Sequence, residues 1–489
     1  MYDIEKIRKR RMAKIIFTDI IIAACVLVVS GFLIAVVAGW RVNSDLSVEQ
    51  NGIVSVHTKP TNAKVYFDDN KEFLTSNTSK MLSGGKHTVR IEKEGYTSWE
   101  KEINIIPGWL VRLEYPRLFK LNRESKEIKN FKNLNFFYAA PNRSTAILNE
   151  NDSSSIVAVY DLNSDKPKFK NIELSNVFAN ENVKNLKNNL EIKRWSKDGK
   201  RILIKLGSEW GTIDLKNEKN IINLSAILKD YKNNTDIDFT QNLLPDAANF
   251  ENDSGDKIIA NINGNLIRID TAAKSITKAT DEKVEKFSVN ESALIYLTKA
   301  KNDVRSIVLT NIGSNSTVKL ADIKDEKSTV TFGLSRYNNV SYILYTINEK
   351  LKVFRAKDFP ISDTDKESMA KIIDQKLTFT PEYTTTSRNN EFIMPISSQN
   401  IALFDIELEK ITSYDYGSNN IRFIDDCIFY QIDENGNLTT WDFDNTNHHT
   451  ISENNAIGRF DAFISQNEHL LYHIQNSNDG VSLVQEKLD

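Results

Sequence analysis

The sequence predicts an all-β ectodomain on a single N-terminal transmembrane helix, with a small antiparallel β-sandwich followed by a seven- or eight-bladed β-propeller. Three observations predict this class. Residues 20–40 form a run of 21 residues without a charge. Residues 52–118 contain short alternating segments separated by Gly and Pro, which is typical of a small sandwich. Residues 125–489 repeat a strand pattern about every 40 to 50 residues, which is typical of propeller blades.

The predicted transmembrane helix covers residues 15–40. Its uncharged part spans roughly 31 Å at 1.5 Å per residue, close to the thickness of the hydrocarbon core of a bilayer. Residues 1–14 form a basic tail, with six Lys or Arg residues against two acidic ones. Basic residues beside a membrane helix stay on the cytoplasmic side. We therefore expect a single-pass protein of the cytoplasmic membrane with its N-terminus inside and its C-terminal ectodomain outside. Trp40 is expected to close the outer end of the helix.

A cleaved signal peptide is the alternative to a retained anchor. Small residues that end at Ala38 offer a cleavage site after a basic start. The apolar run is much longer than the 7 to 15 residues that are usual in a signal peptide, and this favours retention.

The charge balance excludes some partners. The chain carries a net charge of −3. Residues 1–14 contribute +4 and Asp19 contributes −1, so the remainder carries −6. Nucleic acids and anionic lipid surfaces attract dense Lys and Arg, so a mildly acidic ectodomain argues against both. Cys25 lies in the predicted membrane helix and Cys427 far outside it, so we expect no disulfide between them.

The predicted sandwich contains five alternating segments with turn residues between them. They cover residues 53–58, 64–68, 86–92, 99–106 and 110–115. The breaks contain Pro60, Gly84 with Gly85, Gly95, and Pro107 with Gly108. Alternation of apolar and polar residues indicates strands with one buried face.

This region resembles the PEGA domain. The resemblance rests on Pro60 to Ala63, on Val65 to Asp68, on Gly85 with His87 and Val89, and on Lys93 with Gly95 and Tyr96. Thr61 and Asn62 replace the Glu and Gly of the family pattern, and the Thr-Pro often found mid-domain is absent around Thr75 to Thr78. PEGA modules occur in bacterial surface proteins and imply no catalysis, so the resemblance favours a spacer or wall-proximal binding role. His87 is expected at an inward or half-buried strand position, with a packing role favoured over a ligand role.

The rest of the chain contains eight candidate repeat units. The markers of their recurring strand are Asp161, Asp214, Asp270, Thr310, Arg355, Asp405, Asp442 and Gln485. A propeller often completes its last blade with a strand from its other end. We expect residues 117–122 to supply that strand and favour eight blades over seven. Within an insert at residues 217–244, residues 221–231 are predicted to form a short helix that caps one face of the ring.

One hairpin carries the clearest blade signature. Residues 195–200 read Trp-Ser-Lys-Asp-Gly-Lys and resemble the blades of TolB and WD40-like propellers. We expect Asp198 and Gly199 to supply the positive φ of the turn.

No reaction centre is predicted, so the expected catalytic, cofactor-binding and metal-binding residues are none. The chain lacks the serine-hydrolase elbow, the phosphate-binding loop and the zinc-protease motif. The pattern Asp433, Asn435 and Asn437 is interpreted as a hairpin turn and not as a calcium loop. For His448 with His449 a metal site is disfavoured, and His469 and His473 are assigned to packing. Asp425 and Asp426 would diverge on a strand. The repeated Asp residues are expected to tie turns, with cation or sugar binding at one end of the ring as the alternative.

These observations favour a non-catalytic binding protein that is no enzyme and needs no cofactor. Its expected partners are the lipid bilayer, through residues 15–40, and an envelope or surface protein or glycan. The alternatives are an architectural component of a surface assembly and, less favoured, an exported carbohydrate-active enzyme.

Overall fold

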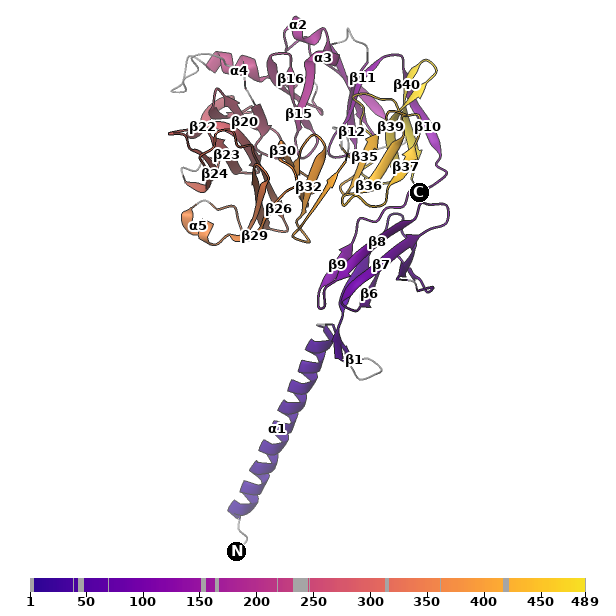
Figure 1. Cartoon of the computed structure of the whole chain (residues 1–489), viewed down its shortest axis with the longest axis vertical. Helices are drawn as coiled ribbons and strands as arrows, with labels where there is room; N and C mark the ends of the chain where they lie inside the picture. The colour runs from indigo at the N-terminus through magenta and orange to yellow at the C-terminus, as the bar shows by residue number, and fades with distance from the viewer. Residues whose placement is uncertain are drawn as a thin grey trace. The chain divides into compact units, whose positions relative to one another are not determined.

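The computed structural model describes residues 4–37, 39–42, 48–68, 70–150, 155–162, 167–217, 219–231, 245, 247–312, 316–360, 362–416 and 422–488. They divide into two compact units, one that ends at Asn122 and one that covers Arg123–Leu488. We describe each unit by itself (Figure 1).

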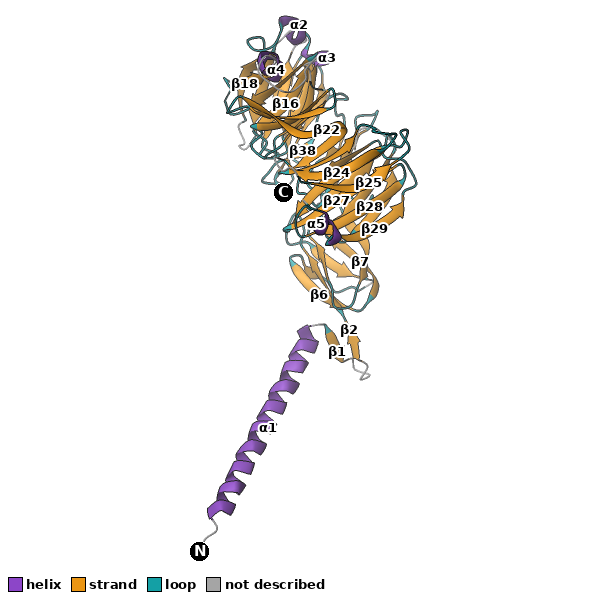
Figure 2. Cartoon of the chain, turned by 90° about the vertical axis from the view of Figure 1, so that its left-hand side faces the viewer, coloured by secondary structure: helices purple, strands orange, loops and turns teal. Residues whose placement is uncertain are grey.

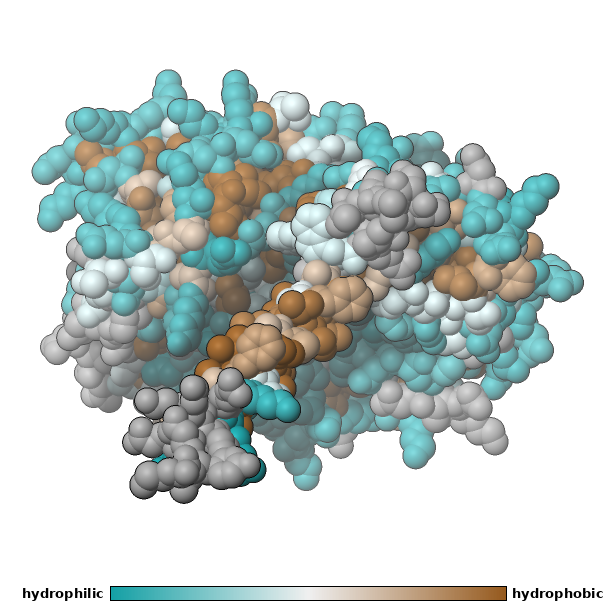
Figure 3. Space-filling model, turned by 90° about the horizontal axis from the view of Figure 1, so that it is seen from below, coloured by the Kyte–Doolittle hydropathy of each residue, from teal (hydrophilic) through white to brown (hydrophobic). Residues whose placement is uncertain are grey.

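The first unit begins with a long helix, α1 (Ile4–Val37). A stretch of it, Arg11–Val36, is long and apolar enough to cross a membrane, a property that N-terminal signal sequences share. Figure 3 shows its apolar side chains as a brown band, which contrasts with the mostly teal surface in that view. The helix ends before Trp40, which lies in strand β1 (Trp40–Val42) and pairs with Gln50 of β2 (Val48–Gln50). The expectation that Trp40 closes the helix is therefore wrong, because its backbone is extended.

The sandwich consists of two sheets. They have the strand orders β6-β3-β9 and β5-β4-β7-β8. The bounds are β3 (Gly52–Val56), β4 (Lys64–Phe67), β5 (Leu74–Thr75), β6 (Thr78–Leu82), β7 (Gly85–Glu92), β8 (Trp99–Ile105) and β9 (Leu110–Leu113). The pairing of β3 with β9 is parallel, which departs from the predicted antiparallel arrangement. Strands β5 and β6 were not predicted, because they are short or polar and lack a clear alternation.

The core of the sandwich explains its strand pattern. Val54, Val65 and Ile91 are fully buried, and Trp99 fills the centre at 1% exposure. His87 is half-buried, as expected for its strand position. Its Nδ1 lies 2.9 Å from Asp68 Oδ2 and its Nε2 lies 2.9 Å from the carbonyl oxygen of Ser83.

Asn62 shows why the departure from the PEGA pattern is tolerated. Its φ is +61°, in the left-handed region that favours glycine, and Asn is among the few other residues that adopt it readily. We expect Asn62→Gly to leave the stability of the sandwich nearly unchanged. Asn62→Val should lower the free energy of unfolding by about 1–2 kcal/mol, because a β-branched side chain clashes there. Urea unfolding followed by the fluorescence of the buried Trp99 measures both changes, and equal effects of the two variants would contradict this account.

Within the described residues the second unit contains six four-stranded sheets and one seven-stranded sheet, in which β22 is shared by two blades, so that eight blades form a propeller (Figures 1 and 2). Consecutive strands are antiparallel neighbours in each blade. The first blade consists of β11 (Leu134–Ala139), β12 (Thr145–Glu150), β13 (Ile156–Asp161) and β14 (Lys168–Glu173), and the second of β15 (Leu190–Trp195), β16 (Arg201–Leu206), β17 (Glu209–Asp214) and β18 (Ile221–Asn223). The third blade consists of β19 (Ala247–Phe250), β20 (Lys257–Ile262), β21 (Asn265–Asp270) and the first part of β22 (Ser275–Asn290). The fourth blade consists of the second part of β22, β23 (Ala293–Thr298), β24 (Arg305–Asn311) and β25 (Thr317–Ile323).

The other four blades complete the ring. They consist of β26 (Val330–Tyr337), β27 (Val340–Ile347), β28 (Lys350–Ala356) and β29 (Ala370–Lys376); β30 (Tyr383–Thr386), β31 (Phe392–Ile396), β32 (Asn400–Asp405) and β33 (Lys410–Asp415); β34 (Arg422–Phe423), β35 (Ile428–Ile432), β36 (Leu438–Asp442) and β37 (His449–Ser452); and β38 (Phe463–Ile464), β39 (Leu470–Ser477), β40 (Gly480–Lys487) and β10 (Ser125–Phe131). All eight predicted marker strands are the third strand of their blade or overlap it, so the predicted count of eight is confirmed.

Ring closure differs from the prediction in one strand. Strand β10 pairs with β40 and completes the eighth blade from the N-terminal end of the unit. Residues 117–122 were expected in this role, but they are used by the sandwich. Leu118 is buried in the sandwich core, and the backbone N–H of Thr97 donates to the carbonyl oxygen of Phe119.

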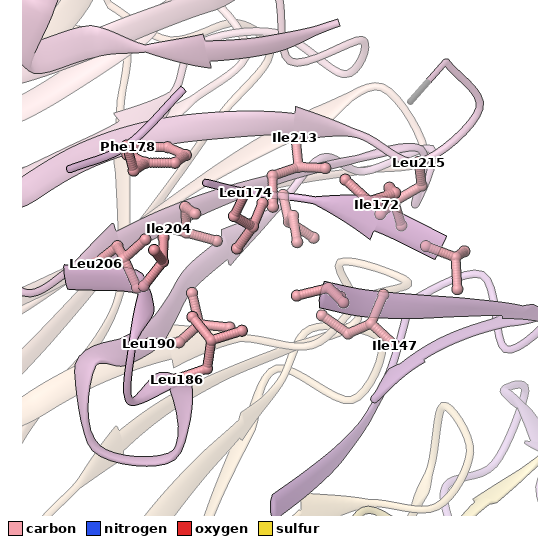
Figure 4. Packing of buried hydrophobic residues seen from close by; sticks show 14 of the residues in the cluster. Ile147, Ile172, Leu174, Phe178, Leu186, Leu190, Ile204, Leu206, Ile213 and Leu215 are labelled. Carbon is pink, nitrogen blue, oxygen red and sulfur yellow. The ribbon is translucent and has the colours of Figure 1, made fainter. Parts of the chain in front are cut away.

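Apolar cores fill the space between neighbouring blades. Figure 4 shows the core between the first two, where Ile147 and Ile172 face Ile204 and Ile213. Short helices accompany the blades: α2 (Asn180–Val183), α3 (Leu186–Asn189), α4 (Leu224–Tyr231) and α5 (Asp363–Glu367).

Helix α4 lies in the predicted helical segment but starts three residues later. Its Leu224 and Leu228 are buried against Trp210 and Ile258, between the second and third blades. It therefore fills an interface between blades, and the expected capping of one face is wrong. The end of the insert, residues 232–244, lies outside the described residues.

Candidate functional site

A cavity of about 740 Å³ lies within the ring of blades. First strands of seven blades contribute to its lining: β11, β15, β19, β22, β26, β30 and β34. The lining is partly aromatic, through Tyr138, Trp195 and Tyr383, and partly hydroxyl- or amide-bearing. This volume lies within the range of small-molecule sites in proteins, so the ring encloses a space in which a ligand fits.

The turn after the first strand of a blade holds its side chains at one end of this cavity. In the second blade, Ser196 Oγ accepts from the backbone N–H of Arg201 at 2.8 Å and donates to Asp198 Oδ1 at 2.7 Å. Asp198 Oδ1 also accepts from the N–H of Lys200 at 3.0 Å. Gly199 has a φ of +68°, whereas Asp198 has no positive φ. The predicted positive φ is therefore confirmed for Gly199 and wrong for Asp198.

The same turn recurs with other residues. In the sixth blade Ser387 Oγ accepts from the N–H of Phe392 at 2.8 Å, and Asn390 has a φ of +61°. In the first blade the left-handed position is taken by Arg143, with a φ of +53°. These turns place Lys197 and Arg388 in the lining of the large cavity.

A smaller cavity of about 250 Å³ adjoins the large one, and the two share Pro141, Arg388 and Phe423 in their lining. Its charged lining residues form two groups of ion pairs. In the first, Asp426 lies 3.1 Å from Arg143 Nη2 and 3.7 Å from Arg388 Nη1. Burial lowers the pKa of Arg388, and the charge of Arg143 lowers it further while Asp426 opposes this.

The second group is the pair of Arg422 and Asp461. Arg422 Nη1 donates to Asp461 Oδ1 and, at 3.1 Å, to the carbonyl oxygen of Phe460. Asp461 Oδ2 accepts from the backbone N–H of Ala139 at 2.9 Å. Burial raises the pKa of Asp461, and Arg422 only partly offsets this. The pair joins the seventh blade to the lead-in of the eighth and to the first, which is a structural role.

Most of the polar residues singled out in the sequence have structural roles. The repeated Asp residues accept from nearby turns: Asp214 from the N–H of Lys216 at 2.9 Å, Asp270 from that of Ala273 at 2.8 Å, and Asp405 from that of Leu408 at 3.0 Å. None of them lines the large cavity. The turn interpretation is therefore confirmed for these three.

The remaining candidates behave similarly. Asp433 accepts from the N–H groups of Asn435 and Asn437, at 2.8 and 2.9 Å, as a hairpin turn requires. His473 is fully buried, with Nδ1 at 2.6 Å from Asn455 Oδ1, so packing is confirmed for it. His469 is exposed, so the packing assignment is wrong there: it precedes β39, where the alternation of the strand does not apply.

His448 stacks on Trp441 with ring centroids 5.6 Å apart. Asp425 accepts from the N–H of Ile428 at 2.8 Å, whereas Asp426 pairs with the two arginines, so the adjacent acids do diverge. Among the described residues no group of three or more His, Cys, Asp or Glu is arranged to hold a metal ion.

Sequence reasoning did not select the basic residues of the cavity. Arg194 precedes the Ser of its turn by two residues, and Lys197 and Arg388 follow theirs by one. A search for Lys or Arg beside each predicted blade turn could have found all three, because those turns end the strands that line the ring.

Comparison with known proteins identifies a family for the sandwich but only a similar fold for the propeller. Residues 51–116 match the PEGA domain, which confirms the resemblance of this segment. Comparison with curated proteins finds no match. Similar solved structures include the C-terminal WD40 domain of Sif2 (TM-score 0.43, 10% identity, 74% of this chain and 97% of that one), an oligogalacturonate lyase in complex with manganese (0.38, 8%, 75% and 98%) and a eukaryotic initiation factor (0.38, 10%, 80% and 96%). Likenesses of this strength say nothing about ligand or activity. The chain is thus defined as a β-propeller protein with a PEGA module and an N-terminal apolar helix.

Proposed function

We propose that this chain is a single-pass, membrane-anchored protein of a bacterial cell envelope that binds a partner through its propeller and catalyses no reaction. The observation that carries the proposal is the cavity enclosed by the ring, whose lining comes from seven blades and includes aromatic, hydroxyl and basic side chains. A ligand there would make many small contacts with several strands, which suits recognition. The partner is an envelope or surface protein or a glycan.

The anchor and its orientation follow from the helix and its basic start. Six Lys or Arg residues within residues 1–14 favour a cytoplasmic N-terminus, and α1 is retained as an anchor. In right-side-out vesicles we expect an added protease to digest the ectodomain and to spare an epitope tag at the N-terminus. Mass spectrometry of the membrane-bound protein should recover peptides from residues 1–14. Loss of these peptides would indicate signal cleavage, and a digested tag would reverse the orientation.

Binding is tested with the full chain in lipid nanodiscs. We expect saturable binding to isolated envelope fractions and no binding by empty nanodiscs. Loss of binding after protease treatment of the fractions would indicate a protein partner, and loss after glycan digestion a carbohydrate. Non-saturable or absent binding, together with self-association of the chain, would contradict the proposal in favour of an architectural role.

A further inference from the structure

The charge of the propeller cavity contrasts with that of the whole chain. The net charge is −3, yet the described lining of the large cavity includes four basic residues and no Asp or Glu: Lys193, Arg194, Lys197 and Arg388. Walls of protein around a single sign of charge focus the electrostatic potential inside a cavity. The cavity is therefore suited to a negatively charged ligand, in a protein whose overall charge would repel one.

Three of these four basic residues have an acidic neighbour. Lys193 pairs with Glu191, Lys197 lies 3.7 Å from Asp253 Oδ2, and Arg388 lies 3.7 Å from Asp426 Oδ1.

Arg194 differs, because it has no hydrogen-bond or ion-pair partner among the described residues. Its side chain is exposed to solvent inside the ring, and the surrounding protein lowers the pKa of its guanidinium. An exposed guanidinium without a partner, in a cavity whose described lining holds no carboxylate, is free to pair with a bound anion.

A second guanidinium supports the same conclusion from the adjoining cavity. Arg143 is 9% exposed, and its Nε and Nη1 are buried without a hydrogen-bond partner in the described structure. Only its Nη2 pairs at short range, with Asp426. Its backbone occupies the left-handed region, which a non-glycine residue adopts at a cost. Two arginines in neighbouring cavities thus keep donors that the protein itself does not use.

The uncharged lining narrows the class of ligand. Asn249, Ser288 and Thr385 come from three blades, and their side chains have no hydrogen-bond partner among the described residues. Such groups bind hydroxyl-rich molecules. Tyr383 lines the same cavity, is 52% exposed and offers an aromatic face on which a sugar ring can stack. An acidic peptide would also pair with the arginines, and its backbone can bond the hydroxyl and amide groups, but an acidic peptide such as polyglutamate has no ring to stack on an aromatic face.

We infer that the propeller cavity binds an acidic saccharide, whose oxyanion, a carboxylate or a phosphate, is held by Arg194 with Arg143 nearby. This inference rests on the proposed binding function and specifies its ligand. The sugar hydroxyls are held by the Asn, Ser and Thr side chains of the inner strands. Binding weakens as salt rises, because the oxyanion is held by charge.

The test uses the full chain in nanodiscs of zwitterionic lipid and calorimetry with four probes. A tetramer of β-1,4-linked glucuronate carries carboxylates, cellotetraose is its neutral counterpart, glucose 6-phosphate carries a phosphate, and hexaglutamate is the peptide. We expect the glucuronate tetramer or the sugar phosphate to bind, with the better of the two identifying the oxyanion, and cellotetraose to bind at least tenfold more weakly.

Variants assign the site. Arg194→Gln should weaken binding of the acidic sugar by about 10- to 100-fold, the range for loss of a charged hydrogen bond. Arg194→Lys should restore part of it. The matched control is Arg355→Gln, which removes a charge from an exposed pair with Glu409 outside the cavity and should leave binding unchanged. Unchanged melting temperatures of the variants exclude a folding defect.

Several results would overturn the inference. They are equal binding of cellotetraose and the acidic tetramer, an unaffected Arg194→Gln variant, no binding of either acidic sugar, and preference for hexaglutamate. The proposed binding function and its proposed ligand class can fail independently of each other. If wild type and Arg194→Gln bind envelope fractions equally and saturably, the function stands and only its ligand class is wrong.

Discussion

Asp461→Ala is expected to lower the free energy of unfolding of the propeller by about 1–3 kcal/mol, the usual cost of leaving a partly buried polar group without its partner. The variant leaves the guanidinium of Arg422 without its carboxylate partner. It also removes the acceptor of the backbone N–H of Ala139. Both losses fall where the seventh, eighth and first blades meet, so they weaken the closed ring.

Urea unfolding of the full chain in detergent, followed by tryptophan fluorescence, measures this change. Asp374→Ala is the matched control, because its pair with Lys371 is exposed on the outer strand of the fifth blade and should contribute little. The double variant Asp461→Ala with Arg422→Met should recover part of the stability, since it no longer contains a half-buried charge without a partner. If the single variant behaved like the exposed control, the assigned structural role would be wrong.

Gly480→Ala is expected to destabilise the propeller by about 2–4 kcal/mol, from backbone strain together with a clash. The φ of Gly480 is +136°, which side-chain-bearing residues rarely adopt. A Cβ there would lie 2.2 Å from the carbonyl oxygen of Phe131 and 3.0 Å from Cα of Lys132. Because both contacts are with backbone at the end of β10, the closing strand itself must move.

Gly85→Ala separates the two contributions. Gly85 has a φ of +121°, and a Cβ at this position meets nothing within 4 Å. It should therefore show the cost of strain alone, and Gly480→Ala should exceed it. Hydrogen exchange of the β10 amides should rise in Gly480→Ala and stay unchanged in Gly85→Ala. Equal costs, or unchanged protection of β10, would contradict the account of closure.

Local chemistry explains which parts of the fold were predictable. Marker strands such as 212–215 and turns such as 195–200 are specified by neighbouring residues, so eight units could be recognised from alternation and turn chemistry alone. The strand that closes the ring was assigned to the wrong residues, because residues 117–122 and β10 both have the sequence pattern of a short strand. Only contacts with distant parts of the chain, Thr97 for the first and Val484 for the second, decide their roles.

The candidate site was less predictable than the fold. Arg194 and Arg388 look like ordinary polar positions at strand ends, and neither belongs to a motif. The closed ring brings them to one cavity, and the described lining of that cavity lacks Asp and Glu because of which side chains seven separate strands turn inward. Arg194 is unusual because it lies in the cavity and has no partner among the described residues, and neither property is visible in a sequence.

The pairing of β10 with β40 also dictates an order of events during synthesis. Arg123, just before β10, contacts Glu486 on β40, 363 positions later. Strand β10, the first strand of the propeller to be synthesised, can therefore pair only after β40, the last described strand, has been made. Closing a loop of this length costs about 5 kcal/mol of chain entropy, so the finished blades must stabilise the nascent protein before the ring can close. Until then both strands have unpaired edges, and the nascent chain is open to aggregation or chaperone binding in that interval.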